Sequence, residues 1–188
     1  MGRVVVTEFV TLDGVMEDPG GGEKSPYGGW AFQFERGEAG DRFKLEELMA
    51  ADALLLGRRT YEGFAAAWPS MNEDEFGRKM NSMPKFVASL TLDRADWNAT
   101  IIPGNVGGEI ESLKAQPGGD LLIYGSGTLV DELTRRGLID EYRLMFHPVV
   151  VGAGKKLFET APPTTLRLAD KAVTDAGVAV LTYTRAAE

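Results

Sequence analysis

The sequence predicts an α/β fold: a mainly parallel central sheet flanked by helices, with antiparallel strands at the C-terminal end. Two observations predict it. Up to about residue 137, short apolar segments alternate with segments of helical periodicity, a pattern typical of parallel sheets. After that point the β-rich segments follow one another with no helix between them, which favours antiparallel pairing. Residues 1–188 are expected to form one domain with no internal repeat.

Valine, isoleucine, threonine and aromatic residues mark the expected strands. The segment RVVVTEFVT at 3–11 is the first, and Asp13-Gly14 closes it with a turn. DALLL at 52–56 and DLLIY at 120–124 are short apolar runs typical of buried strands. The remaining strands are expected at 85–90, 142–151, 164–173 and 178–183.

Apolar residues at helical spacing predict helices at 41–51, 60–67, 106–115 and 128–137. In the first of these, Phe43, Leu45 and Leu48 lie mostly on one face, and Asp41 is well placed to cap the N-terminus. In the last, Gly137 is the expected stop.

Two segments between these elements lack a regular pattern. In DPGGGEKSPYGG, residues 18–29, glycine and proline are so frequent that no regular element can persist. This loop is either a disordered surface insertion or a mobile lid. The acidic run NEDEF at 72–76 is expected to be solvated surface rather than a metal site, because hard cations need converging oxygens.

Composition excludes several classes of function. A net charge of −8 and a pI near 4.8 argue against general binding to nucleic acid or anionic membranes, so any bound anion must be held by a local site. The absence of cysteine and the presence of a single histidine exclude thiolate metal sites, cysteine nucleophiles and histidine-rich zinc clusters. No secretory signal or membrane-spanning apolar run is recognised, and a cytoplasmic location is expected.

Two stretches follow buried strands and precede helices, which is where ligands bind in open parallel sheets. In LLLGRRT, Arg58 and Arg59 could each bind phosphate and Thr60 could add a hydroxyl. In LLIYGSGTL, Gly125 and Gly127 would let the backbone approach a pyrophosphate at the start of a helix. The alternative is that the first stretch is a solvated helix start and the second a plain turn. The third glycine of the common dinucleotide fingerprint is replaced by valine at position 130, which disfavours a standard Rossmann domain.

The ordered motifs TLDG, GRRTYE, KFVASLT, IYGSGTLVDEL and DEYRLMFHPVVVGAGKKLF resemble the dihydrofolate reductase-like superfamily. They are more closely similar to its branch containing the C-terminal reductase domain of bacterial riboflavin biosynthesis, over about residues 4–183. The resemblance implies a dihydrofolate reductase-like fold, a reductase that uses NADPH along the carboxyl edge of the sheet, and a homodimer.

The resemblance also implies residue roles at the cofactor. Carried over residue by residue, the resemblance places Thr11, Asp13 and Gly14 near the nicotinamide ribose. It places Gly57, Arg58, Arg59 and Thr60 at the adenine-side phosphates, with Ser89 beside Arg58 at the 2′-phosphate. It places Gly125, Ser126, Gly127 and Thr128 at the pyrophosphate. Two positions depart from the family pattern. Ser126 stands where the folate enzyme usually has glycine, and Leu90 replaces a commonly polar residue, which weakens the case for NADPH over NADH.

The proton donor is less well defined by the sequence. Counting back from Gly57 by the spacing of the folate enzyme leads to Asp41, the candidate catalytic residue, which could instead be only a helix cap. Glu35 and Glu38 compete with it, and His147 has the only near-neutral reference pKa, although a histidine before proline at a strand end is more often structural. Aromatic residues Trp30 and Phe34 either line the substrate pocket or belong to the core.

The leading hypothesis is therefore an NADPH-dependent reductase of a small heterocyclic molecule that is pyrimidine- or pterin-like. The alternative is a protein of the same fold that binds a nucleotide or a pterin without catalysing a reaction. A third interpretation is that both glycine-containing stretches are turns without a ligand.

Overall fold

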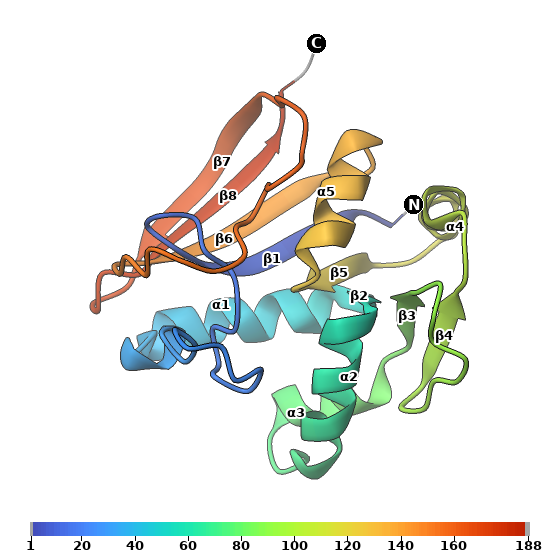
Figure 1. Cartoon of the computed structure of the whole chain (residues 1–188), viewed down its shortest axis with the longest axis horizontal. Helices are drawn as coiled ribbons and strands as arrows, with labels where there is room; N and C mark the ends of the chain where they lie inside the picture. The colour runs from blue at the N-terminus through green and yellow to red at the C-terminus, as the bar shows by residue number, and fades with distance from the viewer. Residues whose placement is uncertain (1, 187–188) are drawn as a thin grey trace.

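The computed structural model describes residues 2–186, whose strands form one eight-stranded sheet (Figure 1). The strands are β1 (Val4–Thr11), β2 (Ala51–Gly57), β3 (Lys85–Ala88), β4 (Ala99–Ile102), β5 (Asp120–Tyr124), β6 (Glu141–His147), β7 (Leu166–Val173) and β8 (Ala179–Arg185). Their order across the sheet is β4-β3-β2-β5-β1-β6-β8-β7.

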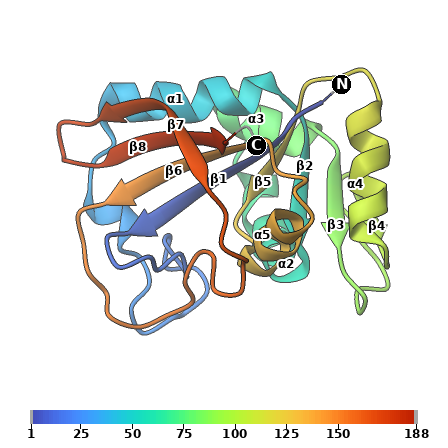
Figure 2. The same ribbon diagram turned by 90° about the horizontal axis from the view of Figure 1, so that it is seen from above.

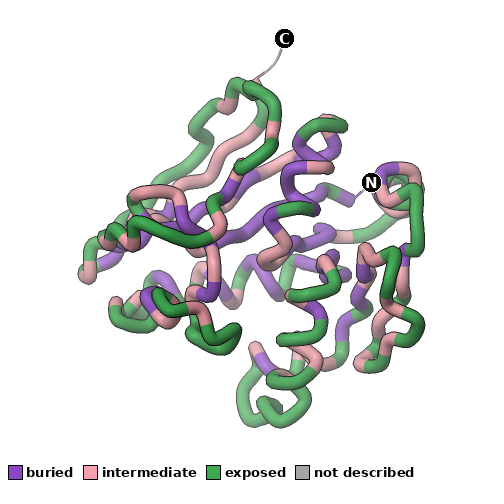
Figure 3. Tube along the Cα trace, in the orientation of Figure 1, coloured by how far each residue is buried: buried purple, intermediate pink, exposed green. Residues whose placement is uncertain are grey.

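The pairing confirms a mainly parallel sheet with antiparallel C-terminal strands. All neighbours from β4 to β6 run parallel, whereas β8 pairs antiparallel with both β6 and β7. The last strand in sequence thus lies between β6 and β7, and β7 forms the edge. In Figure 3 the central strands are mostly buried, while β7 is exposed along almost its whole length.

The helices are α1 (Gly37–Ala50), α2 (Arg58–Ala67), α3 (Glu75–Ser82), α4 (Val106–Ala115) and α5 (Gly127–Arg135), with short 3₁₀ turns η1 (Ala31–Gln33) and η2 (Trp68–Ser70). They build a separate apolar core on each face of the sheet. Leu48 of α1 and Met80 of α3 belong to one core, and Ile110 of α4 and Leu133 of α5 belong to the other. Helices α1 and α5 accordingly lie on opposite sides of the sheet (Figure 2).

Strand β1 occupies the centre of the sheet because it pairs in parallel with both β5 and β6. Its first residues Val4, Val5 and Val6 are fully buried. Alternation along the strand places Val5 in the core under α1 and Val4 and Val6 in the core under α5. In the middle of the strand two polar residues follow, Thr7 and Glu8, which are both almost entirely buried.

Some boundaries differ from the sequence-based expectation. Helix α1 begins at Gly37, so Asp41 lies inside it and forms an ion pair with Arg36 at 3.0 Å; the prediction that Asp41 caps the helix is wrong. The first turn of α1 was missed because it contains glycine and polar residues and so carries no apolar signal. The strand expected at 142–151 ends at His147, since Pro148 has no N–H to continue the ladder.

Helix α3 and strand β4 were not predicted. The acidic run at 72–76 is exposed over its first four residues, as expected, but it also starts α3, where the Asp74 carboxylate accepts the Gly77 N–H at 2.7 Å. Strand β4 has four residues of which one is buried, so it has too little apolar pattern to be recognised.

The loop at 18–29 contains no regular element, and it is ordered around Asp18. This side chain accepts the N–H groups of Glu23 and Ser25 at 2.9 and 3.0 Å, and its carbonyl oxygen accepts those of Gly21 and Gly29. These bonds satisfy backbone groups that a disordered insertion would leave to water.

Replacing Asp18 with alanine is expected to loosen this loop, because two backbone donors lose their carboxylate acceptor. Lys24 lies within the loop, so trypsin should cut the native Asp18→Ala protein there faster than the wild type. Asp93→Ala, a change at an exposed aspartate, is the control and should leave the cleavage rate unchanged. Equal rates for all three proteins would contradict the ordering role of Asp18.

Candidate functional site

A cleft of about 1450 Å³ lies at the carboxyl ends of the central strands. Its wall combines the ends of β1 and β5, the inner face of α1, the first residues of α2 and α5, and part of the loop at 18–29. The cleft therefore lies where parallel sheets generally bind ligands.

Two turns face each other in this cleft. The first turn, residues 57–60, joins β2 to α2, and the second turn, residues 125–128, joins β5 to α5. The hydroxyl of Ser126 connects them, because it accepts the Gly57 N–H at 2.6 Å and donates to Thr60 Oγ1 at 3.0 Å. The two stretches that the sequence singled out thus form one surface.

The backbone of the second turn is tightly constrained. Gly125 has φ +64°, and a Cβ there would lie 2.9 Å from Thr60 Oγ1. Ser126 has φ 67°, a left-handed conformation that costs a non-glycine residue roughly 1–2 kcal/mol. The two hydrogen bonds of its hydroxyl offset that cost, which explains how serine serves where the folate enzyme usually has glycine.

The start of each helix brings N–H groups and cations to the cleft. Helix α2 begins at Arg58 and α5 at Gly127, so their N-terminal dipole ends both border it. The Arg59 side chain is exposed on the cleft wall and makes no hydrogen bond or ion pair with any residue in 2–186. Lys155 reaches in from the loop after β6 and donates to Thr128 Oγ1 at 2.8 Å.

Lys155 was not assigned a role from the sequence. It lies in the GAGKKLF segment, whose glycines suggest a loop but not its direction. The Lys155 backbone N–H donates to Glu17 in the loop after β1 at 3.0 Å, and its side chain reaches Thr128 at the start of α5. A cation at the second turn could only be found once this long-range contact was known.

Arg58 and Ser89 both line the cleft. The Arg58 guanidinium donates to Glu62 at 2.7 Å and to Thr91 Oγ1 at 2.6 Å, and the Ser89 hydroxyl accepts the Leu92 N–H at 3.0 Å. The loop after β3 is therefore fastened beside Arg58, so that a phosphate could meet both side chains.

One buried part of the cleft wall is polar. Thr7, Glu8, Lys44 and Glu47, here called the inner cluster, are each 6% exposed or less, and the first three line the cleft. Lys44 Nζ donates to Thr7 Oγ1 at 2.9 Å and forms an ion pair with Glu47. It also lies 4.4 Å from the centre of the Tyr124 ring.

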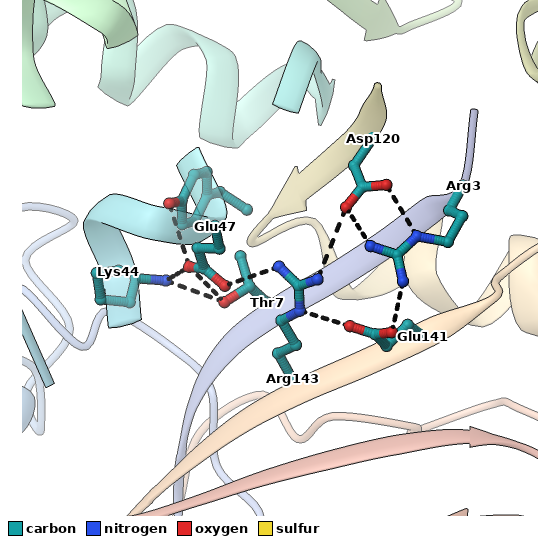
Figure 4. A network of polar contacts seen from close by, with 8 residues as sticks. Arg3, Thr7, Lys44, Glu47, Asp120, Glu141 and Arg143 are labelled. Atoms are coloured by element: carbon teal, nitrogen blue, oxygen red, sulfur yellow. Dashed lines mark hydrogen bonds and ion pairs between the residues drawn. The ribbon is translucent and has the colours of Figure 1, made fainter. Parts of the chain in front are cut away.

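The inner cluster continues into a chain of ion pairs along the sheet (Figure 4). Arg143 lies between the Glu47 carboxylate and two further acidic residues, Glu141 and Asp120. Its Nε donates to Glu141 at 2.6 Å, and its Nη2 lies 3.6 Å from Asp120. Arg3 also forms ion pairs with these two residues, with Asp120 at 2.7 Å and with Glu141 at 2.9 Å. Glu47 is thereby held between two cations, which compensates for burying its charge.

Burial shifts the pKa values within the inner cluster in opposite directions for acid and base. Loss of solvation raises the pKa of Glu8 to about 8, despite the nearby Lys44 charge and the Gly125 backbone, which lower it. Burial also lowers the pKa of Lys44, although Glu47 acts against this shift. A carboxylic acid and an amine with displaced pKa values thus meet at one end of the cleft.

Three predicted cofactor residues, Thr11, Asp13 and Gly14, are not among those that line the cleft. They brace a turn instead. Asp13 accepts a hydrogen bond from the Thr11 hydroxyl at 2.6 Å and from the N–H groups of Val151 and Gly152 at 3.2 and 2.8 Å. These bonds, with the Thr11 hydroxyl contributing most and the Gly152 N–H next, lower the pKa of Asp13 to about 2.

His147 is part of the core. It is fully buried, its Nδ1 lies 3.0 Å from the Met145 carbonyl oxygen, and burial lowers its pKa. Trp30 and Phe34 pack edge-on against it at 5.2 and 6.1 Å between ring centres. Of the two interpretations of these aromatic residues, the structure therefore supports the core; Phe9 and Phe32 line the cleft in their place.

Asp41 is at the cleft, while Glu35 and Glu38 are not among its lining residues. The Asp41 side chain is 65% exposed and engaged by Arg36. Glu8 was overlooked because it lies within the valine-rich first strand, where a single polar residue looks like ordinary alternation. No group of three metal-binding side chains occurs within residues 2–186, and no helix there is long and apolar enough to cross a membrane.

Comparison with known proteins gives three findings. The family model of the RibD C-terminal domain matches residues 3–182. The uncharacterized protein YyaP of Bacillus subtilis (strain 168) is 30% identical over 187 residues, which cover 96% of this chain and 94% of that protein.

The third finding is likeness to solved structures. A putative riboflavin biosynthesis protein from Shewanella sp. PV-4 matches with a TM-score of 0.79 at 19% identity, covering 98% of this chain and 99% of that one. A dihydrofolate reductase from Enterococcus faecalis, complexed with NADP(H), matches with a TM-score of 0.60 at 15% identity, covering 97% and 96%. At such low identity these matches show the fold, which confirms the dihydrofolate reductase-like prediction.

Ser126 is expected to stabilise the joined turns through its hydroxyl. Ser126→Ala removes both hydrogen bonds and keeps the left-handed strain, so the free energy of unfolding should fall by about 1–3 kcal/mol. Ser126→Gly removes the same bonds but relieves the strain, so its loss should be smaller. Urea unfolding measures both. A glycine variant that is less stable than the alanine variant would contradict this account.

Glu8 is expected to make stability depend on pH. Between the unfolded pKa near 4.5 and the folded pKa of about 8, the folded chain keeps a proton that the unfolded chain has lost. The contribution of Glu8 to stability should therefore be full below pH 4.5 and be lost as pH rises to 8, by up to about 5 kcal/mol. Glu8→Gln cannot ionise and should flatten this slope in thermal unfolding across pH 5–8, whereas Glu46→Gln, an exposed control on α1, should not. Parallel curves for all three proteins would exclude a raised Glu8 pKa.

Proposed function

The chain belongs to the RibD C-terminal domain family, and we propose that it is an NADPH-dependent reductase that transfers a hydride to a small pyrimidine- or pterin-like heterocycle. The observation that carries the proposal is the joining of the two turns by Ser126. This contact places the N-termini of α2 and α5 side by side at one cleft. The cations Arg58, Arg59 and Lys155 line the same cleft, as a ligand with several phosphates would require.

The residues present fit a dinucleotide. Side chains at Gly57 or Gly125 would crowd the opposite turn, since a Cβ would lie 3.1 Å from Ser126 Oγ or 2.9 Å from Thr60 Oγ1. Glycine at these two positions therefore lets the backbones of the two turns approach each other closely at the cleft. Arg58, Arg59 and Ser89 would hold the adenine-side phosphates, and the second turn with Lys155 would hold the pyrophosphate.

The bound nucleotide would supply the hydride. The chain's own contribution is to orient donor and acceptor side by side and to exclude water from the inner cluster. Phe9, Phe32 and Leu45 give this part of the cleft apolar surface on which a flat heterocycle could pack, while Lys44 and Glu8 supply polar contacts.

The proposal also includes a cytoplasmic homodimer. Strand β7 is an edge strand with seven of its eight residues exposed, so its unpaired backbone groups are open to a second copy. The mass in solution, measured by light scattering after size-exclusion chromatography, decides between monomer and dimer.

A parallel titration with NADPH and NADH tests the nucleotide site, with binding followed by tryptophan quenching. Arg58→Ala and Arg59→Ala should each weaken NADPH binding by about 10–100-fold and NADH binding much less, because only NADPH carries the 2′-phosphate. Lys155→Ala should weaken both nucleotides by a similar factor, because both carry the pyrophosphate. Arg94→Ala, which changes an exposed arginine outside the cleft, is the matched control.

Two results would count against the reductase. Failure of the wild type to bind either nucleotide would leave both stretches as plain turns. Tight NADPH binding without oxidation of the nucleotide, across a panel of pyrimidine and pterin acceptors, would favour the non-catalytic binding protein.

A further inference from the structure

Glu8 is an ionisable residue in the cleft that has no assigned partner. It lies on β1 between Thr7 and Phe9, lines the cleft, and is 6% exposed. Its Oε1 is shielded from solvent and has no hydrogen-bond partner within residues 2–186. Buried polar atoms in native proteins are nearly always satisfied, so an unsatisfied one at a cleft points to a missing ligand.

The charged groups around Glu8 do not neutralise it. Lys44 and Glu47 of α1 act on it electrostatically, but Lys44 is already bound to Glu47 and to the Thr7 hydroxyl. The backbone N–H of Gly125 faces it from the second turn. Farther along the cleft, Arg36 is paired with Asp41, and Glu17 binds the Lys155 backbone.

Glu8 is thus the carboxyl in the cleft best suited to hold a proton. A raised pKa of about 8 leaves it mostly protonated at neutral pH, as an acid that can give one hydrogen bond and accept another. Asp41 differs in both respects, since its side chain is 65% exposed and bound by Arg36.

We propose that Glu8 is the proton donor of the cleft, giving its proton to a ring nitrogen or carbonyl oxygen of the heterocycle being reduced. This inference rests on the proposed reductase function and adds to it the residue that completes the reaction. Its location also fits, because Glu8 is within reach of the Gly125 N–H of the second turn, where the pyrophosphate would be held, and of the Lys44 charge in the inner cluster.

The chemistry balances with NADPH as the reductant. A carbon of a C=N or C=O bond gains the hydride, and the electron pair of that π bond moves to the nitrogen or oxygen. The O–H bond of Glu8 then breaks and an N–H or O–H bond forms on the substrate. Glu8 is left as a carboxylate beside Lys44, whose charge stabilises it, and regains its proton from water when the product leaves.

The first test needs no substrate. Infrared spectroscopy should show the carbonyl stretch of a protonated carboxylic acid at pH 7, which disappears as the pH rises through about 8. The band should be missing in Glu8→Gln and retained in Glu46→Gln. The same titration is repeated with NADPH bound. Absence of the Glu8 band at pH 7, with or without NADPH, overturns the inference.

The second test uses a panel of cyclic imines and heterocyclic carbonyl compounds as acceptors. Glu8→Gln should lower the rate of NADPH oxidation by about 100-fold or more, while NADPH binding stays unchanged. Unchanged turnover in Glu8→Gln, or a greater loss in Asp41→Asn, overturns the inference. If no panel compound is reduced, the infrared titration of the NADPH complex decides.

The two proposals fail differently. A wild type that does not bind NADPH contradicts the reductase, whereas Glu8 without a proton in a protein that binds and oxidises NADPH contradicts only the proton donor.

Discussion

The hydroxyl of Ser126 is the contact on which the cleft depends. It joins β2–α2 to β5–α5, segments 66 and 69 residues apart in sequence, through one accepted and one donated hydrogen bond. Without these two hydrogen bonds, nothing would offset the strain of the left-handed backbone at Ser126. Through these bonds Gly57 and Thr60 are tied to the turn that follows β5, beside the N-termini of α2 and α5.

The cleft is chemically divided. Its outer part gathers Arg58, Arg59 and Lys155 in a protein whose overall charge is −8, so the local attraction for phosphate opposes the general field. Its inner part buries Lys44 and Glu47 as a compensated pair, tied to Arg143. This division matches a ligand with phosphates at one end and a neutral ring system at the other.

Much of the fold could be predicted from the sequence because apolar runs and glycine stops mark β1, β2, β5 and α5 directly. The joined turns could be identified as candidates, but not their contact, which depends on a long-range pairing of β2 with β5. Glu8 and Lys155 could not be assigned for the same reason: one lies in a valine-rich strand and the other in a glycine-rich loop. Local pattern identifies elements, whereas a site arises where distant elements meet.

The central place of β1 has a consequence for folding during synthesis. Val4 pairs with Leu121 and Val5 with Glu141, so β1 has no neighbour in the sheet until β5 and β6 have been translated. The segment VVV then remains an unpaired apolar strand, the kind of segment that aggregates when exposed. We expect the sheet to close late, around β1, because its pairings join residues far apart in the sequence.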